Sequence, residues 1–194
     1  MAAYEIVVVG TSLGGLEALE TLLSGLPTDF PLPLAIVQHR RAGSDGMLAD
    51  LLRRHSALPV EEPHDKEEIA AGRVYLAPAD YHLMVEPGMF ALSTEGPVRY
   101  ARPSIDVLFT TAADAYAHRV IAVVLTGAND DGAQGAARVK AAGGLLIVQA
   151  PETAESAAMP GAALAAAPAD RVLPLAEIAP CLTCLCHAAQ KETL

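Results

Sequence analysis

The chain has 194 residues, the length of one domain, and its 52% hydrophobic and 19% charged residues suit a protein with a buried core. Its formal net charge of −10 argues against binding to nucleic acid, whose phosphates attract basic surfaces. No apolar run approaches the ~20 residues that cross a bilayer, and the N-terminus has no signal-peptide pattern. The three cysteines make no disulfide framework, which is typical of a cytoplasmic protein. Together these features lead us to expect a cytoplasmic protein that neither binds nucleic acid nor enters the membrane.

Strands and helices alternate through the first part of the chain. The β-branched run at 4–10 predicts a strand buried on both faces, and apolar residues at helical spacing predict a helix over 14–27. A second strand and a second helix are expected over 32–39 and 44–55. The polar stretch at 61–72 has the composition of a loop.

The middle of the chain differs, because proline and glycine divide it into short strands. These strands are expected over 72–78, 81–88 and 89–94. Pro87-Gly88 is a tight-turn signal, so the last two strands should pair as an antiparallel hairpin.

The alternating pattern then returns, with a helix, a strand, a helix and a strand expected over 103–119, 120–127, 132–144 and 145–151. Ser104 is placed to cap the first of these helices, and the Ala-rich tail from about residue 155 predicts short helices. Strands that alternate with helices indicate a doubly wound α/β fold. We therefore expect one three-layer α/β/α domain over 1–194, with a mostly parallel sheet and an inserted antiparallel β-hairpin.

Three of the expected strands end in side chains that suit nucleophilic catalysis, namely Ser12, His39 and Asp131. In a doubly wound sheet, ligands bind beyond the carboxyl ends of the strands, so parallel neighbours would bring these side chains to one edge. A serine hydroxyl needs a base such as imidazole to take its proton, and the imidazole needs a carboxylate to fix its tautomer. Together the three residues are candidates for a catalytic triad.

Each of these residues also has a structural interpretation. Ser12 is a residue type that caps helices, His39 could be structural at a strand end, and Asp131 before Gly132 is typical of a turn. Their joint placement favours catalysis, because three unrelated structural causes would have to coincide.

Catalysis at a carbonyl carbon also needs N–H donors for the charge that develops on its oxygen. A helix that begins near Leu13 would offer free backbone N–H groups and the positive end of its dipole. The loop at Gly127-Ala128 would supply another donor. Gly14 and Gly15 would let the chain turn sharply and leave space for a substrate.

Other site motifs are absent or weak. The stretch "GTSLGG" is not a dinucleotide fingerprint, no P-loop is present, and the serine is not in G-x-S-x-G. Near the C-terminus, four potential metal ligands lie on adjacent turns of an expected helix, at Cys181, Cys184, Cys186 and His187. Because zinc sites usually draw on two separated pairs of ligands, we expect these thiols to be small core residues, and we expect no metal and no cofactor.

Several motifs in order resemble the catalytic domain of the chemotaxis protein-glutamate methylesterases, the CheB family, over about residues 4–180. They are "VVVGTSLGGLEAL", "AIVQH", "RVYLAPADYHLMV", "RPSIDVLF", "VLTGANDDGAQG" and "AAMPGAA". The resemblance implies a Ser-His-Asp hydrolase that demethylates glutamate γ-methyl esters on chemoreceptor cytoplasmic helices, releases methanol and also deamidates certain receptor glutamines. By motif position the nucleophile is Ser12, the base His39 and the carboxylate Asp131.

Two departures from the family pattern lie around the expected oxyanion and substrate pocket. Leu13 replaces the usual threonine after the serine, and in the T-G-M-G loop Ala128 replaces the methionine and is followed by Asn129. Backbone N–H donors survive such changes. The departures nevertheless motivate an alternative, a catalytically impaired module that uses the same cleft to recognise receptor or signalling helices. A third possibility is an esterase or amidase for an unrelated small acyl substrate.

The resemblance also suggests partners. Glutamate-rich receptor helices would meet an acidic protein, so local arginines must orient them, and the candidates are Arg40, Arg41 and Arg102. The family commonly carries an N-terminal receiver domain, but the first expected strand begins almost at Met1. We therefore expect no receiver domain in this chain, and regulation, if a receiver is involved, by a separate receiver-domain protein.

Overall fold

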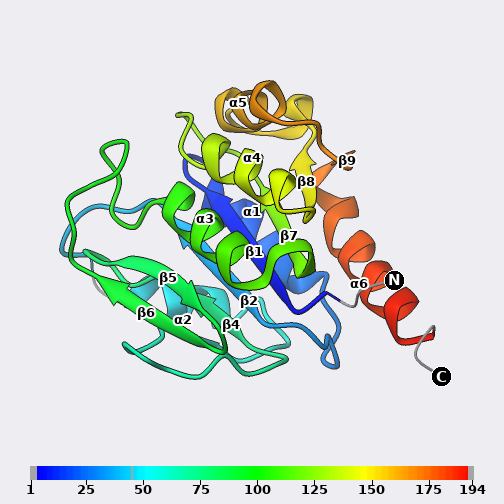
Figure 1. Ribbon diagram of the computed structural model, residues 1–194, viewed down its shortest axis with the longest axis horizontal. Coiled ribbons are helices and arrows are strands. Elements are labelled where there is room, and N and C mark those ends of the chain that lie inside the picture. Colours follow the sequence, from blue (N-terminus) through cyan, green and yellow to red (C-terminus); the bar gives the residue numbers. More distant parts are fainter. Residues whose placement is uncertain (1–3, 45, 192–194) are drawn as a thin grey trace.

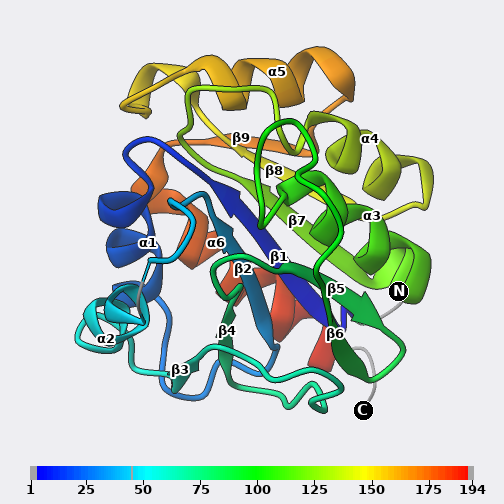
Figure 2. The ribbon, with the colours of Figure 1, turned by 90° about the vertical axis from the view of Figure 1, so that its left-hand side faces the viewer.

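The structure is a computed structural model that describes residues 4–44 and 46–191. Its main element is a seven-stranded sheet in the order β3-β4-β2-β1-β7-β8-β9, in which every neighbouring pair is parallel (Figure 1 and Figure 2). Its strands are β1 (Ile6–Thr11), β2 (Leu34–Gln38), β3 (Val60–Glu61), β4 (Val74–Leu76), β7 (Val120–Val124), β8 (Leu145–Gln149) and β9 (Arg171–Leu173). A separate antiparallel hairpin consists of β5 (His82–Glu86) and β6 (Met89–Ser93).

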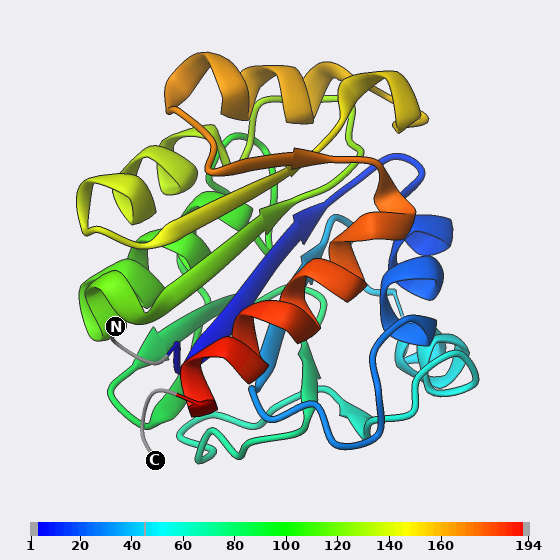
Figure 3. The same ribbon diagram turned by 90° about the vertical axis from the view of Figure 1, so that its right-hand side faces the viewer.

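Helices cover both faces of the sheet. They are α1 (Gly15–Ser24), α2 (Met47–Arg53), α3 (Ile105–Tyr116), α4 (Ala133–Ala141), α5 (Ala158–Ala166) and α6 (Leu175–Lys191), with short 3₁₀ turns at Ala117–Arg119 and Pro151–Thr153. Helices α1, α2 and α6 pack on one face, and Figure 3 shows α6 lying across it beside α1. Helices α3, α4 and α5 and the hairpin pack on the other face, where Figure 2 shows the hairpin beside α3.

The central strand β1 explains why the fold needs two helical layers. All six of its residues are buried, and successive side chains point to opposite faces of the sheet. Ile6 and Val8 belong to the core under α3, whereas Val7 and Val9 belong to the core under α1. A continuous apolar run is therefore satisfied only when both faces are covered.

The expected fold class is confirmed, and so is the hairpin, but two strands and the length of the C-terminal helix were not foreseen. The two-residue strand β3 begins at the edge of the stretch interpreted as a loop, and β9 lies in the tail. That tail also ends in the 17-residue helix α6 rather than in short helices only. Pro180 lies inside α6, where it costs one backbone hydrogen bond. The helix continues because Ile178, Leu182 and Cys186, spaced four residues apart, bury one face against the sheet.

The order of the strands places a binding crevice at the carboxyl ends of β1 and β7. From β1 the chain passes through α1 to β2 on one side, and from β7 it passes through α4 to β8 on the other side. Helices α1 and α4 consequently lie on opposite faces of the sheet. Such a switch point is where doubly wound folds bind their ligands.

Helices α3 and α4 approach each other closely at Gly135. A Cβ atom at this position would lie 2.5 Å from Cβ of Phe109 and 3.2 Å from the backbone of Asp106. The absence of a side chain at Gly135 is therefore what allows the first turn of α4 to contact the first turns of α3.

We expect Gly135→Ala to lower the free energy of unfolding by about 1–3 kcal/mol, because the added methyl group forces two packed helices apart. Gly161→Ala in α5 is the matched control. A Cβ atom at Gly161 would have no contact within 4 Å, so this substitution should be neutral or stabilising by up to about 1 kcal/mol, since alanine favours helix. Urea denaturation of both variants measures the difference. Equal effects of the two substitutions would contradict the close approach.

Candidate active site

The sheet itself places Ser12 and His39 side by side. Thr11 and Gln38 are register partners at the ends of the parallel neighbours β1 and β2, so the two candidate residues follow directly. The backbone N–H of His39 donates to Thr11 O at 3.1 Å, and that of Ser12 donates to Thr126 O at 3.0 Å. The expected convergence of strands β2, β1 and β7 is thus confirmed, and strand hydrogen bonds hold the backbone of both residues.

Gln38 ties the same two residues together from below. Its Nε2 donates to the carbonyl oxygens of Ser12 at 2.9 Å and of His39 at 2.8 Å. Sequence reasoning missed this role. The signal was present, because a polar residue at the end of the otherwise apolar strand β2 needs hydrogen-bond partners when buried.

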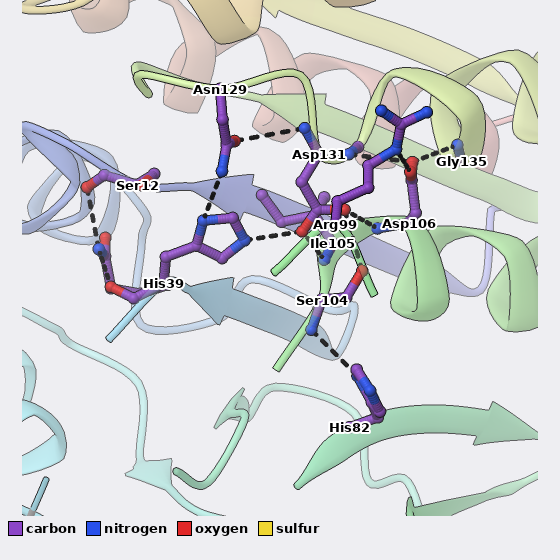
Figure 4. Close-up of polar contacts among 12 residues, drawn as sticks. Ser12, His39, His82, Arg99, Ser104, Ile105, Asp106, Asn129, Asp131 and Gly135 are labelled. Atoms are coloured by element: carbon purple, nitrogen blue, oxygen red, sulfur yellow. Dashed lines mark hydrogen bonds and ion pairs between the residues drawn. The ribbon is translucent and has the colours of Figure 1, made fainter. Parts of the chain in front are cut away.

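His39 and Asp131 form the hydrogen bond that a triad requires. His39 Nε2 lies 2.7 Å from Asp131 Oδ2, and the aspartate is fully buried while the imidazole keeps slight access to solvent. Figure 4 shows the ring between the carboxylate on one side and Ser12 and Asn129 on the other. The structure therefore brings all three predicted triad residues to one edge of the sheet.

The carboxylate of Asp131 is held at the N-terminus of α3. Its Oδ1 accepts from Ser104 Oγ at 2.9 Å and from Asp106 N at 3.0 Å, and its Oδ2 accepts from Ile105 N at 2.8 Å. Burial by itself would raise the pKa of Asp131, but the hydrogen bonds from His39 and from the backbone of Asp106 and Ile105 outweigh it and lower the pKa. The buried group is therefore an anion that can stabilise a positively charged imidazole.

Asp106 makes the reciprocal contact to α4. Its Oδ1 accepts from the backbone N–H groups of Gly132 at 2.9 Å and Gly135 at 2.7 Å, and its Oδ2 accepts from Arg99 Nε at 2.9 Å. Burial and the nearby Asp131 charge raise the pKa of Asp106 in spite of these donors. Asp131, which lies beside α4, thus caps α3, and Asp106 of α3 caps α4. Sequence reasoning missed Asp106 and Arg99, because nothing local in the chain pairs them.

Ser104 has a different role from the predicted one. It occupies the N-cap position of α3, but its side chain makes no capping hydrogen bond to the helix and donates to Asp131 instead. Its backbone N–H donates to Nδ1 of the buried His82 at 3.2 Å. The helix is capped by an acid that is distant in the chain, and that acid was not visible as a cap from local sequence.

The backbone N–H groups of Leu13 and Ala128 remain candidates for an oxyanion site. Within the described residues, neither Leu13 N nor Ala128 N donates a hydrogen bond. Thr126 links their two segments, because its Oγ1 donates to Leu13 O at 2.9 Å and its carbonyl accepts from Ser12 N. The free donors therefore belong to two segments that are fixed against each other, as an oxyanion site needs.

The glycines after Leu13 serve the turn and the packing. Helix α1 begins at Gly15 rather than near Leu13, and Gly14 adopts a left-handed φ of 75°, which favours glycine. A Cβ at Gly14 would lie 2.5 Å from Oε2 of Glu155, and one at Gly15 would lie 1.9 Å from Oε1 of Gln38. A larger residue at either position would therefore have to displace a protein side chain, while Gly14 and Glu155 line a cavity of about 470 Å³.

A cavity of about 260 Å³ opens beside His39, and two of the predicted arginines, Arg40 and Arg102, line it. Arg40 is mostly buried and pairs with Glu62 Oε1 at 2.7 Å through Nη2, which also donates to Ala77 O. Its Nε and Nη1 are buried without a partner among the described residues. Arg102 differs, because its Nη1 donates to the backbone oxygens of Thr94 and Glu95.

The cysteines near the C-terminus divide among three environments. Cys186 is buried, Cys181 is half-buried and Cys184 is exposed, so the expectation of core thiols holds for Cys186 and not for Cys184. Burial raises the pKa of Cys186 to about 11. The side chain of His187 lies outside the described residues. Within the part of the chain that is described, no group of three or more side chains is arranged to hold a metal ion, and no helix is long and apolar enough to cross a bilayer.

Known proteins are similar to this chain in both sequence and fold. A putative protein-glutamate methylesterase/protein-glutamine glutaminase of Leptospira interrogans is 48% identical over 177 residues, which cover 91% of this chain and 92% of that protein. The protein-glutamate methylesterase/protein-glutamine glutaminase of Thermotoga maritima is 38% identical over 178 residues, and the chain spans about half of its length, 52%.

The crystal structure of the Thermotoga maritima CheB methylesterase catalytic domain matches with a TM-score of 0.89 at 38% identity, covering 95% of this chain and all of that one. The sequence pattern of the CheB methylesterase family matches residues 7–182, which is most of the chain. The resemblance noted from the sequence motifs is therefore confirmed, and the chain belongs to the CheB methylesterase family.

Proposed function

We propose that this protein is a protein-glutamate methylesterase that hydrolyses glutamate γ-methyl esters on chemoreceptor cytoplasmic helices. The observation that carries the proposal is the 2.7 Å contact between His39 Nε2 and Asp131 Oδ2 at the edge where Ser12 lies. It directs the other ring nitrogen, Nδ1, toward the side of Ser12 (Figure 4). Family membership and the names of the relatives from Leptospira interrogans and Thermotoga maritima support the substrate.

The geometry supports an acyl-enzyme mechanism. His39 Nδ1 takes the proton of Ser12 Oγ as this oxygen attacks the ester carbonyl carbon, and Asp131 stabilises the imidazolium. Leu13 N–H and Ala128 N–H bind the oxyanion. As the C–O bond breaks, His39 returns the proton to the leaving oxygen, which departs as methanol. A water molecule, deprotonated by His39, then hydrolyses the acyl-enzyme to glutamate and free Ser12.

The same residues serve deamidation of receptor glutamines. The amide carbonyl takes the place of the ester carbonyl, and His39 protonates the leaving nitrogen, which departs as ammonia. The acyl-enzyme is then the same as in ester hydrolysis. One site therefore suffices for both names that the relatives carry.

The alternative of an impaired binding module is not favoured. Leu13 and Ala128 motivated it, but their proposed contribution is a backbone N–H, which does not depend on the side chain. Labelling of Ser12 by a fluorophosphonate separates the two functions, because a catalytically dead module would not react. A panel of small methyl and aryl esters beside a methylated receptor fragment tests the third possibility, an unrelated acyl substrate.

We further propose that the protein acts in the cytoplasm on methylated receptor helices and that a separate receiver-domain protein is its regulator. A locally basic cavity supports the first part, because Arg40 and Arg102 face it although the chain as a whole carries a charge of −10. Screening confines repulsion from the rest of the surface to roughly 8 Å at physiological salt.

Ser12→Ala should reduce kcat by roughly 10⁴–10⁶-fold, because it removes the nucleophile. Its thermal stability should stay close to that of the wild type, since Ser12 Oγ makes no hydrogen bond to another described residue. Methanol release from a methylated receptor fragment measures the activity. Ser44→Ala, at an exposed serine of the loop after His39, is the control and should retain full turnover.

Asp131→Asn should lower kcat by about 10⁴-fold. It should also make the free energy of unfolding depend less on pH in acid. Because the pKa of Asp131 is lowered in the folded protein, its stabilising contribution is complete above the unfolded pKa of about 3.9 and is lost as the pH falls through the folded value. Urea denaturation from pH 7 to pH 3 should therefore show the gap between wild type and variant shrinking in acid. A gap of constant size would refute the lowered pKa.

Arg40→Lys should raise KM for a methylated receptor fragment by about tenfold or more and change kcat less. Lysine keeps the positive charge but not the planar guanidinium, whose Nη2 binds both Glu62 and Ala77 O at the wall of the cavity, and a hydrogen bond to a charged group contributes about 1.5–3 kcal/mol. Arg54→Lys, at an exposed arginine at the end of α2, is the matched control. Identical KM values in all three proteins would remove Arg40 from substrate binding.

A further inference from the structure

The side-chain amide of Asn129 lies between two members of the triad. Its Oδ1 accepts a hydrogen bond from the backbone N–H of Asp131 at 3.3 Å, and its Nδ2 lies 3.4 Å from His39 Nδ1 (Figure 4). The Asp131 N–H can only donate, so it must face the oxygen of the amide. This contact determines which end of Asn129 faces the imidazole, and that end is the NH₂ group.

The proton positions on His39 follow from its two neighbours. Asp131 is an anion with a lowered pKa, so its carboxylate can only accept, and the proton of the neutral ring lies on Nε2. Nδ1 then carries a lone pair, and Asn129 Nδ2–H donates to it. The same lone pair is the one that must receive the proton of Ser12 in the proposed mechanism.

Asn129 is not needed to choose the tautomer of His39. The 2.7 Å bond to Asp131 does so already and is much shorter than the 3.4 Å contact to Asn129. What the amide adds is occupation of Nδ1, and Ser12 Oγ makes no hydrogen bond to that nitrogen within the described residues. In the proposed mechanism Ser12 Oγ must reach the same atom, so Asn129 and Ser12 are competitors for it.

We propose that Asn129 is a positioning residue that holds His39 Nδ1 in a resting state and must turn away before Ser12 can transfer its proton. The inference rests on the proposed roles of Ser12 and His39. Asn129 can turn away readily, because it is exposed and both of its contacts are long. In the T-G-M-G pattern quoted above, glycine stands at this position, and glycine has no amide side chain.

The test is the rate at which a fluorophosphonate in excess labels the full-length protein. In this reaction Ser12 Oγ bonds to phosphorus, fluoride leaves, and His39 Nδ1 takes the hydroxyl proton. Asn129→Ser and Asn129→Ala should label roughly two- to tenfold faster than the wild type, the range expected for release of one weak hydrogen bond. Gln134→Ala removes an exposed amide from the first turn of α4 and should leave the rate unchanged.

Asn129→Ser distinguishes two causes of faster labelling, namely release of His39 Nδ1 and loosening of the loop. A serine hydroxyl can still accept from the Asp131 N–H, but it carries no amide nitrogen. In ¹⁵N-histidine-labelled protein, the His39 Nδ1 resonance, assigned by its loss in His39→Gln, should move toward the position of a nitrogen without a hydrogen bond in both Asn129 variants.

Equal or slower labelling of Asn129→Ser overturns the inference, because the amide would then support the ring rather than occupy it. A wild type that is not labelled at Ser12 refutes the proposed function instead. In that case the resonance decides about Asn129 alone: a shift in the serine variant supports its contact with Nδ1, and an unchanged resonance overturns it.

Discussion

The buried carboxylate of Asp131 is the interaction on which the site depends. A fully buried anion is costly unless it is hydrogen-bonded, and this one has four donors, from Ser104 Oγ, Ile105 N, Asp106 N and His39 Nε2. Three of them belong to the start of α3, whose positive dipole end also favours the charge. The fourth is the candidate base, so helix capping and orientation of His39 are performed by one group.

Two sources of rigidity meet at this edge. Strand pairing and Gln38 hold the backbones of Ser12 and His39, whereas the contacts between α3 and α4 hold the side chain of Asp131. Asp106 completes the second source by binding the N-terminus of α4. Substitutions in this helix pair therefore act on the imidazole without touching the ligand, because they move the carboxylate that orients it.

Features that involve neighbouring residues or the carboxyl ends of strands could be predicted. Continuous apolar runs indicated the buried sheet, and the direction of the strands brought Ser12, His39 and Asp131 together. The prediction of a local cap was wrong where a distant group decided. Ser104 does not cap α3 because Asp131 does. The length of the C-terminal helix was underestimated, because burial of one face outweighs the hydrogen bond lost at its internal proline.

By itself the sequence determined the α/β class, the catalytic candidates and the family, since apolar periodicity and strand ends are local properties and several motifs occur in order. Only the tertiary structure decided which groups hold the triad in place. Gln38, Ser104, Asp106 and Asn129 act across long chain separations, through hydrogen bonds whose partners are chosen by packing. The direction of each of these bonds depends on how α3, α4 and the strand ends pack against one another. No local sequence pattern predicts that packing.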